Sequence, residues 1–248
     1  MALPIKQLEK LSLSRRNLLR WGLLSLGTAA IAGLPKVLIA QSSKPMPTLT
    51  FNADDFGILN FALLLEEIEA AFYEAVVKSG KISDRTESEY MTALGDHQAA
   101  HVQFFRNLLG DKISFQTNEL CFNKAGLASR VSDRNTILNT AVTLEDLGVH
   151  AYNWAGVNLT NPNFLLAASS IVSVEARHAA GVRQLQERPA TEPNSDRVMT
   201  KAELVKSLNP FLGAAYDELY TPTQIVGIID SLNILKNRIN GALLALPG

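Results

Sequence analysis

Two acidic residues in the central part of the chain, Glu66 and Glu145, lie in segments that are similar to each other. The segment LLEEIEAAFY (64–73) aligns with TLEDLGVHAY (143–152), and a tyrosine, Tyr73 or Tyr152, follows each glutamate by seven residues. On a helix this spacing returns to nearly the same face after two turns. The duplication indicates two related halves of one site, with carboxylates that could bind cations.

A second pair of segments repeats in the same way around two histidines. Glu175 precedes His178 by three residues, and Gln98 precedes His101 by the same number. This spacing puts both members of each pair on one helical face. One half therefore carries a glutamate and a histidine, and the other half carries a glutamine and a histidine.

The heptad pattern predicts that the carboxylates point into a helical core. Glu66 shares a stripe with Leu59, and Glu145 shares the equivalent stripe with Leu138. Burying several carboxylates is strongly unfavourable unless protons, hydrogen bonds or cations compensate their charge. Two divalent cations would do so, since diiron bundles use one glutamate from each of two helices and a Glu-x-x-His pair from each of the others. The expected ligands are Glu66, Gln98, His101, Glu145, Glu175 and His178.

Gln98 leaves this set one carboxylate short. A neutral amide oxygen can bind a hard cation, but it cannot offset the charge of the cation as a carboxylate does. Three solutions follow from the sequence. Glu69 could become the fourth carboxylate, because it faces the space opened by Gly148 at the duplicate position; His97 could turn in as an extra nitrogen ligand; or only one metal ion binds.

The other polar residues near these segments have plainer expected roles. Tyr73 and Tyr152 are expected to pack in the core with their hydroxyls hydrogen-bonded, where they could donate to the ligands or serve as radical sites. His150 is expected on the surface. No catalytic residue is assigned.

Four helices are expected to position these side chains. Asp54 or Asp55 can cap the first, Gly80 can end it, and Asn161 followed by Pro162 can begin the fourth. The expected bounds are about 55–79, 83–86 to 109, 134–159 and 162–186. Residues 111–133 show no sustained periodicity, and so long a connection suits a crossover along a bundle.

The segments NFALLLEEIEAAFYEA, HQAAHVQFFRNLLG, LEDLGVHAYNWA and SIVSVEARHAAGVR, between about Ile58 and Leu185, resemble the ferritin-like domain of bacterial exported and desiccation-related proteins. The resemblance implies an all-α, ferritin-like four-helix bundle with a dinuclear iron or manganese site that reacts with oxygen or peroxide. In that family the residue before AAH in the second helix is typically glutamate, whereas this chain has Gln98.

The N-terminal region is typical of a targeting segment. A basic start precedes the apolar residues 21–34, and SRRNLLR (14–20) resembles the twin-arginine export signal. An ordinary secretory signal is the alternative, and both predict a mature chain that is periplasmic or otherwise outside the cytoplasm. Cleavage is expected near Ala40, but Leu38 suits it poorly, so an uncleaved signal could serve as a membrane anchor.

The expected domain organisation is a signal segment (1–41), a linker (42–54), the bundle (55–187) and a helical extension (188–248). Helices at about 201–208 and 222–235 of the extension are expected to pack on an outer face of the bundle.

Composition narrows the function classes. The 248 residues carry a net charge of −1 without a basic block, which argues against nucleic-acid binding, and the single cysteine, Cys121, excludes an intramolecular disulfide. The pattern at 14–20 makes the twin-arginine export machinery the expected partner. The leading hypothesis is an exported oxidoreductase-like protein in stress protection, and the competing one is a non-catalytic, metal-poor scaffold. Mineral storage would require an oligomeric shell, which no sequence feature indicates.

Overall fold

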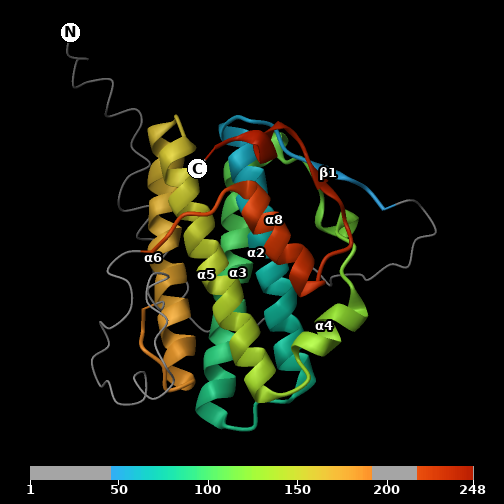
Figure 1. The fold of residues 1–248 in the computed structure, drawn as a ribbon, viewed down its shortest axis with the longest axis vertical. Coiled ribbons are helices and arrows are strands. Elements are labelled where there is room, and N and C mark those ends of the chain that lie inside the picture. Colours follow the sequence, from blue (N-terminus) through green and yellow to red (C-terminus); the bar gives the residue numbers. More distant parts are fainter. Residues whose placement is uncertain (1–45, 192–216, 248) are drawn as a thin grey trace. The chain divides into compact units, whose positions relative to one another are not determined.

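Four long helices run side by side and form the body of the protein (Figure 1). The computed structural model describes residues 46–191 and 217–247. The helices are α2 (Asp55–Ser79), α3 (Arg85–Leu109), α5 (Arg134–Asn158) and α6 (Pro162–Leu185). The all-α bundle predicted from the sequence is confirmed.

Local capping determines where these helices begin and end. The Asp54 side chain accepts a hydrogen bond from the backbone N–H of Gly57 at 2.7 Å, and Gly80 ends α2 in the left-handed conformation with φ of 61°. Asp84, Asp133 and Asn161 cap the next three long helices in the same manner. The observed bounds agree with the expected ones to within one or two residues because the caps are local features.

The helices pack as two antiparallel pairs, α2 with α3 and α5 with α6, and α2 also contacts α5. The connection between the pairs, residues 110–133, runs back along the bundle, so α3 and α5 point in the same direction (Figure 1). It contains the short helix α4 (Lys124–Arg130). The expected crossover is therefore present, with a helical turn in it that the sequence pattern did not predict.

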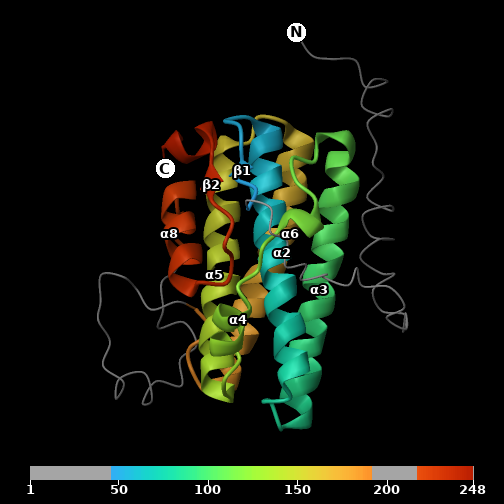
Figure 2. The same cartoon turned by 90° about the vertical axis from the view of Figure 1, so that its right-hand side faces the viewer.

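The C-terminal residues pack on α5 and against the crossover (Figure 2). Helix α8 (Pro222–Leu232) packs on α5, and β2 (Ile239–Asn240) pairs in parallel with β1 (Leu49–Thr50). Helix α8 ends three residues earlier than expected because Asn233 takes the left-handed conformation. The backbone N–H of Asn123 then donates to the carbonyl of Ile234 at 2.6 Å.

Two expected segments, the signal at 1–41 and the helix at 201–208, lie outside the described residues. Within the described residues, every helix is too short or too polar to cross a bilayer.

Candidate metal centre

Three carboxylates meet in the middle of the bundle, as the heptad pattern predicted. Glu66 comes from α2, Glu145 from α5 and Glu175 from α6, and each is at most 1% exposed. The apolar stripes that pack the helices together carry these side chains inward. Burial raises the pKa of Glu145 to about 8 and also raises that of Glu66, because a negative charge is unfavourable in the buried core.

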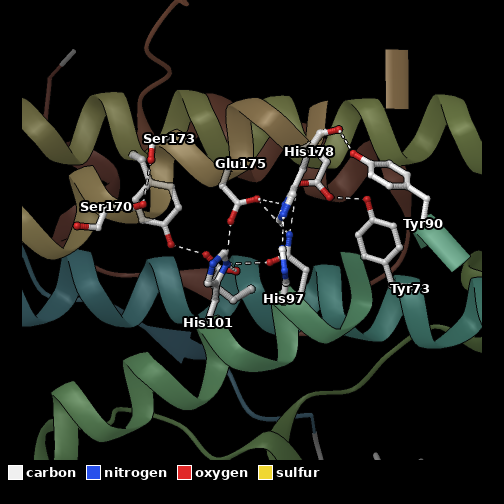
Figure 3. Close-up of polar contacts among 12 residues, drawn as sticks. Tyr73, Tyr90, His97, His101, Ser170, Ser173, Glu175 and His178 are labelled. Carbon is white, nitrogen blue, oxygen red and sulfur yellow. Dashed lines mark hydrogen bonds and ion pairs between the residues drawn. The ribbon is translucent and has the colours of Figure 1, made fainter. Parts of the chain in front are cut away.

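The potential ligand atoms form two clusters that share one residue. Glu66, His101 and Glu175 make one cluster, Glu145, Glu175 and His178 make the other, and the ligand atoms of each lie within 4.8 Å of one another. Glu175 lies between the two histidines (Figure 3). Its Oε1 is 2.8 Å from His101 Nδ1 and its Oε2 is 3.1 Å from His178 Nδ1. One carboxylate is thus placed to bridge two cations.

Both halves of the site use the same histidine atom. His101 Nδ1 is 3.1 Å from Glu66 Oε2, and His178 Nδ1 is 3.1 Å from Glu145 Oε2. Burial lowers the pKa of each histidine, but the carboxylates outweigh it and raise the pKa of His101 to about 10 and that of His178 to about 9. Burial likewise disfavours the charge on Glu175, yet the two neighbouring histidines lower its pKa below the usual range. Without metal, the site would therefore combine two imidazolium groups with the Glu175 carboxylate and with two carboxyl groups whose ionisation burial disfavours.

Gln98 lies across the site from Glu175 and is fully buried. Its Nε2 donates to Glu175 Oε2 at 3.1 Å and lies 3.3 Å from Glu145 Oε2, and its Oε1 is 3.1 Å from His101 Nδ1. The amide therefore holds the two carboxylates by donating hydrogen bonds to them. A glutamate at this position could donate a hydrogen bond only if it were protonated.

The two tyrosines bind carboxylates crosswise. Tyr73 of α2 donates to Glu145 of α5, and Tyr152 of α5 donates to Glu66 of α2. Burial, followed by the nearby carboxylates, raises the pKa of both phenols well above the ordinary value, so they remain neutral donors. The sequence predicted hydrogen-bonded hydroxyls but not that each would bind the glutamate of the other helix.

Glu69 and His97, the two possible additional ligands, both lie near this cluster. Glu69 is 2% exposed, and a Cβ atom at Gly148 would lie 3.4 Å from its Oε1, which agrees with the space expected there. Burial, together with Glu175, Glu145 and Glu66, raises the pKa of Glu69 well above its ordinary value. His97 is exposed, and its Nδ1 is 2.8 Å from Nε2 of His178, the nitrogen that faces away from the carboxylates. In this arrangement His97 orients His178 from outside, and its binding to metal remains a prediction.

Two ion pairs near the centre occupy equivalent positions in the two similar halves of the bundle. Arg106 pairs with Glu67, and Arg183 pairs with Asp146. Glu67 and Asp146 directly follow the two inward glutamates, so each duplicated carboxylate is followed by one that ties the helix to its neighbour.

The expectation for His150 was wrong. It is 3% exposed, and its ring lies 4.1 Å from that of Tyr220, measured between centroids. The C-terminal segment covers this face of α5, and a contact between residues so distant in the chain leaves no local pattern.

The chemistry of this donor set fits two hard divalent cations. Carboxylate oxygens and imidazole nitrogens are the ligands that iron and manganese take in such bundles. Glu175 Oε1 is close to His101 but has no hydrogen bond of proper geometry among the described residues, which leaves a buried oxygen for a cation. The one shortfall is charge, because these clusters contain three carboxylates.

Residues 54–188 match the family model described as a ferritin-like domain. This match covers more than half of the chain and spans all four long helices. No curated protein matches the chain.

Proposed function

The chain belongs to the ferritin-like domain family, and from this premise we propose that its bundle holds a dinuclear iron or manganese centre that reacts with oxygen or peroxide. The observation that carries the proposal is Glu175, whose two oxygens face the histidines of two separate clusters. A carboxylate that faces two clusters is the arrangement expected for two bound ions, whereas a single ion pair needs a carboxylate with one partner only.

Each half of the site would hold one ion. Glu66 and His101 would bind the first and Glu145 and His178 the second, with Glu175 shared. When bound, the metal pair would supply one-electron redox exchange with oxygen or peroxide. The chain itself orients the ligands through Tyr73 and Tyr152, keeps water out by burial, and holds the imidazoles so that Nδ1 faces the ions.

Release of protons from the histidines must accompany metal binding. Imidazole binds a metal through a neutral nitrogen, whereas His101 and His178 are both protonated near neutral pH without metal. His97, exposed and 2.8 Å from Nε2 of His178, lies where it can accept a hydrogen bond from that nitrogen once Nδ1 is bound. This contact would select the correct tautomer of His178.

We also propose that the protein acts outside the cytoplasm in stress protection. The support is the twin-arginine pattern at 14–20, which implies export in the folded state. Replacing both Arg15 and Arg16 with lysine should leave the full-length precursor in the cytoplasmic fraction. Unchanged export of that variant would refute the twin-arginine route.

A metal-poor scaffold is the second candidate, and Gln98 favours it. Its amide donates to Glu175 and approaches Glu145 in the absence of metal, and the histidines neutralise part of the remaining charge. A bundle of this kind could persist without ions, whereas four unprotonated carboxylates could not.

Metal stoichiometry separates the two candidates. The folded protein is stripped with a chelator, exposed anaerobically to Fe²⁺ or to Mn²⁺, desalted and measured by elemental mass spectrometry. We expect close to two ions per chain, with large losses in Glu145→Ala and His178→Ala. Glu89→Ala, on an exposed part of α3, is the matched control and should bind as wild type does.

The scaffold would be supported by the opposite pattern. If neither ion is retained, and if Glu145→Ala and His178→Ala melt at or above the wild-type temperature, the metal centre must be abandoned.

A further inference from the structure

The two halves of the bundle differ in their buried acidic residues at two positions beside the site. Helix α3 has Gln98 where α6 has Glu175, so one carboxylate is missing. Helix α2 has Glu69 where α5 has Gly148, so one carboxylate is added. The two departures cancel in charge, and both lie in the same buried region.

Glu69 has no partner that explains its burial. It is 2% exposed, and the charged groups that act on it are the carboxylates of Glu175, Glu145 and Glu66. Among the described residues none donates a hydrogen bond to it. An ionised carboxylate in such surroundings is unfavourable unless a proton or a cation joins it.

Gly148 of α5 lies beside this side chain. A Cβ atom at Gly148 would lie 3.4 Å from Glu69 Oε1 and 3.5 Å from Cγ of Glu175. A longer side chain at position 148 would therefore lie between Glu69 and Glu175. Glycine leaves these two acidic side chains next to each other.

We propose that Glu69 is the fourth carboxylate of the metal centre and supplies the negative charge that Gln98 lacks. This inference rests on the proposed dinuclear function. Two divalent ions carry four positive charges, and Glu66, Glu145 and Glu175 offset three of them. Glu69 does not belong to the two clusters whose ligand atoms lie within 4.8 Å of one another, so its side chain would have to turn toward the ions to bind them.

The two departures thus have different roles. Gln98 donates a hydrogen bond to Glu175, and Glu69 would neutralise the second ion when metal binds. The charge balance of four carboxylates to two divalent ions is kept, but the fourth carboxylate comes from a different helix.

A double-mutant cycle tests this exchange directly. Wild type, Glu69→Gln, Gln98→Glu and the double variant are each titrated with Mn²⁺, and bound and free metal are counted by electron paramagnetic resonance. Glu69→Gln should weaken binding of the second ion at least tenfold. The double variant should recover that loss, because the carboxylate introduced at position 98 then supplies the charge. Glu74→Gln, a charge change of the same kind toward the outside of α2, should bind as wild type does.

The outcomes distinguish this inference from the proposed function. Two ions bound equally well by wild type and Glu69→Gln would overturn the role of Glu69 and leave the dinuclear centre standing. One ion in both, with two only after Gln98→Glu, would also overturn it. No ion in any variant would refute the proposed function itself. Thermal unfolding in chelator shows whether each variant is folded, and Glu69→Gln should be at least as stable as wild type there because it removes an unpaired acid.

Discussion

Replacing Gln98 with glutamate should destabilise the metal-free protein. The Gln98 amide is fully buried, with Nε2 3.1 Å from Glu175 Oε2 and 3.3 Å from Glu145 Oε2. A hydrogen bond to a charged group contributes about 1.5–3 kcal/mol. A glutamate can keep at most one of these donors, and only when it is protonated. We therefore expect the free energy of unfolding to fall by about 2–5 kcal/mol, from loss of one or both bonds.

This loss should appear as a lower melting temperature in the presence of chelator. For a domain of this size 1 kcal/mol corresponds to about 2–4 °C, so the midpoint should fall by roughly 5–15 °C. Saturating Mn²⁺ should offset part of this loss, because the added carboxylate tightens metal binding. A tenfold lower Kd adds about 1.4 kcal/mol to the stabilisation by metal.

Differential scanning calorimetry with EDTA and with Mn²⁺ measures both effects. Gln103→Glu is the matched control, since Gln103 is exposed on the same helix and bonds only to Asn107 among the described side chains. It should shift the midpoint by little in either condition. If Gln98→Glu melts with wild type in EDTA, the amide does not hold the carboxylates. If Mn²⁺ stabilises both proteins equally, the charge at position 98 has no bearing on the metal.

Contacts in the centre and between α4 and the C-terminal segment lead to four further predictions. The raised pKa values of His101 and His178, about 10 and about 9, mean that their stabilising charge is fully present below about pH 6.5 and is lost as the pH rises toward 10, so the metal-free midpoint should fall over that range; a flat profile from pH 6.5 to 10 would contradict this. For each proton that Mn²⁺ displaces, the apparent affinity should rise about tenfold per unit increase in pH. Isothermal titration at several pH values can measure this. Tyr152→Phe removes the donor to Glu66 and should weaken metal binding by about 10- to 100-fold without unfolding the bundle, and wild-type affinity would exclude an orienting role. Gly126→Ala should destabilise the fold by about 2 kcal/mol or more in chemical denaturation, because its Cβ would lie 1.8 Å from the carbonyl oxygen of Asn233. A Cβ at Gly156 meets no atom within 4 Å, so Gly156→Ala should be neutral or stabilising by up to about 1 kcal/mol. Equal effects of the two would refute the close approach of α4 to the C-terminal segment.

The bundle and its inward carboxylates could be predicted because the causes are local. Asp54, Asp84 and Asp133 cap helices through atoms within three residues, and Gly80 ends α2 by its own backbone conformation. The three-residue step between Glu175 and His178 places them on one face of any helix. These features depend on neighbours in the chain and are therefore readable without knowledge of the fold.

The contacts between helices depended on tertiary packing. Tyr73 bonds to Glu145 across 72 residues, and the sharing of Glu175 by two clusters requires α2, α3, α5 and α6 to meet at one level of the bundle. The burial of His150 follows in the same way from Tyr220, which no periodic pattern connects to it. The residue types and their helical faces are consequences of chain-local geometry, whereas their partners are set by how the long helices and the C-terminal segment pack. For that reason the sequence named Gln98 and Glu69 as the two departures from the duplication, and only the packed core showed that Gln98 donates to the carboxylates while Glu69 lies buried beside them without a donor among the described residues.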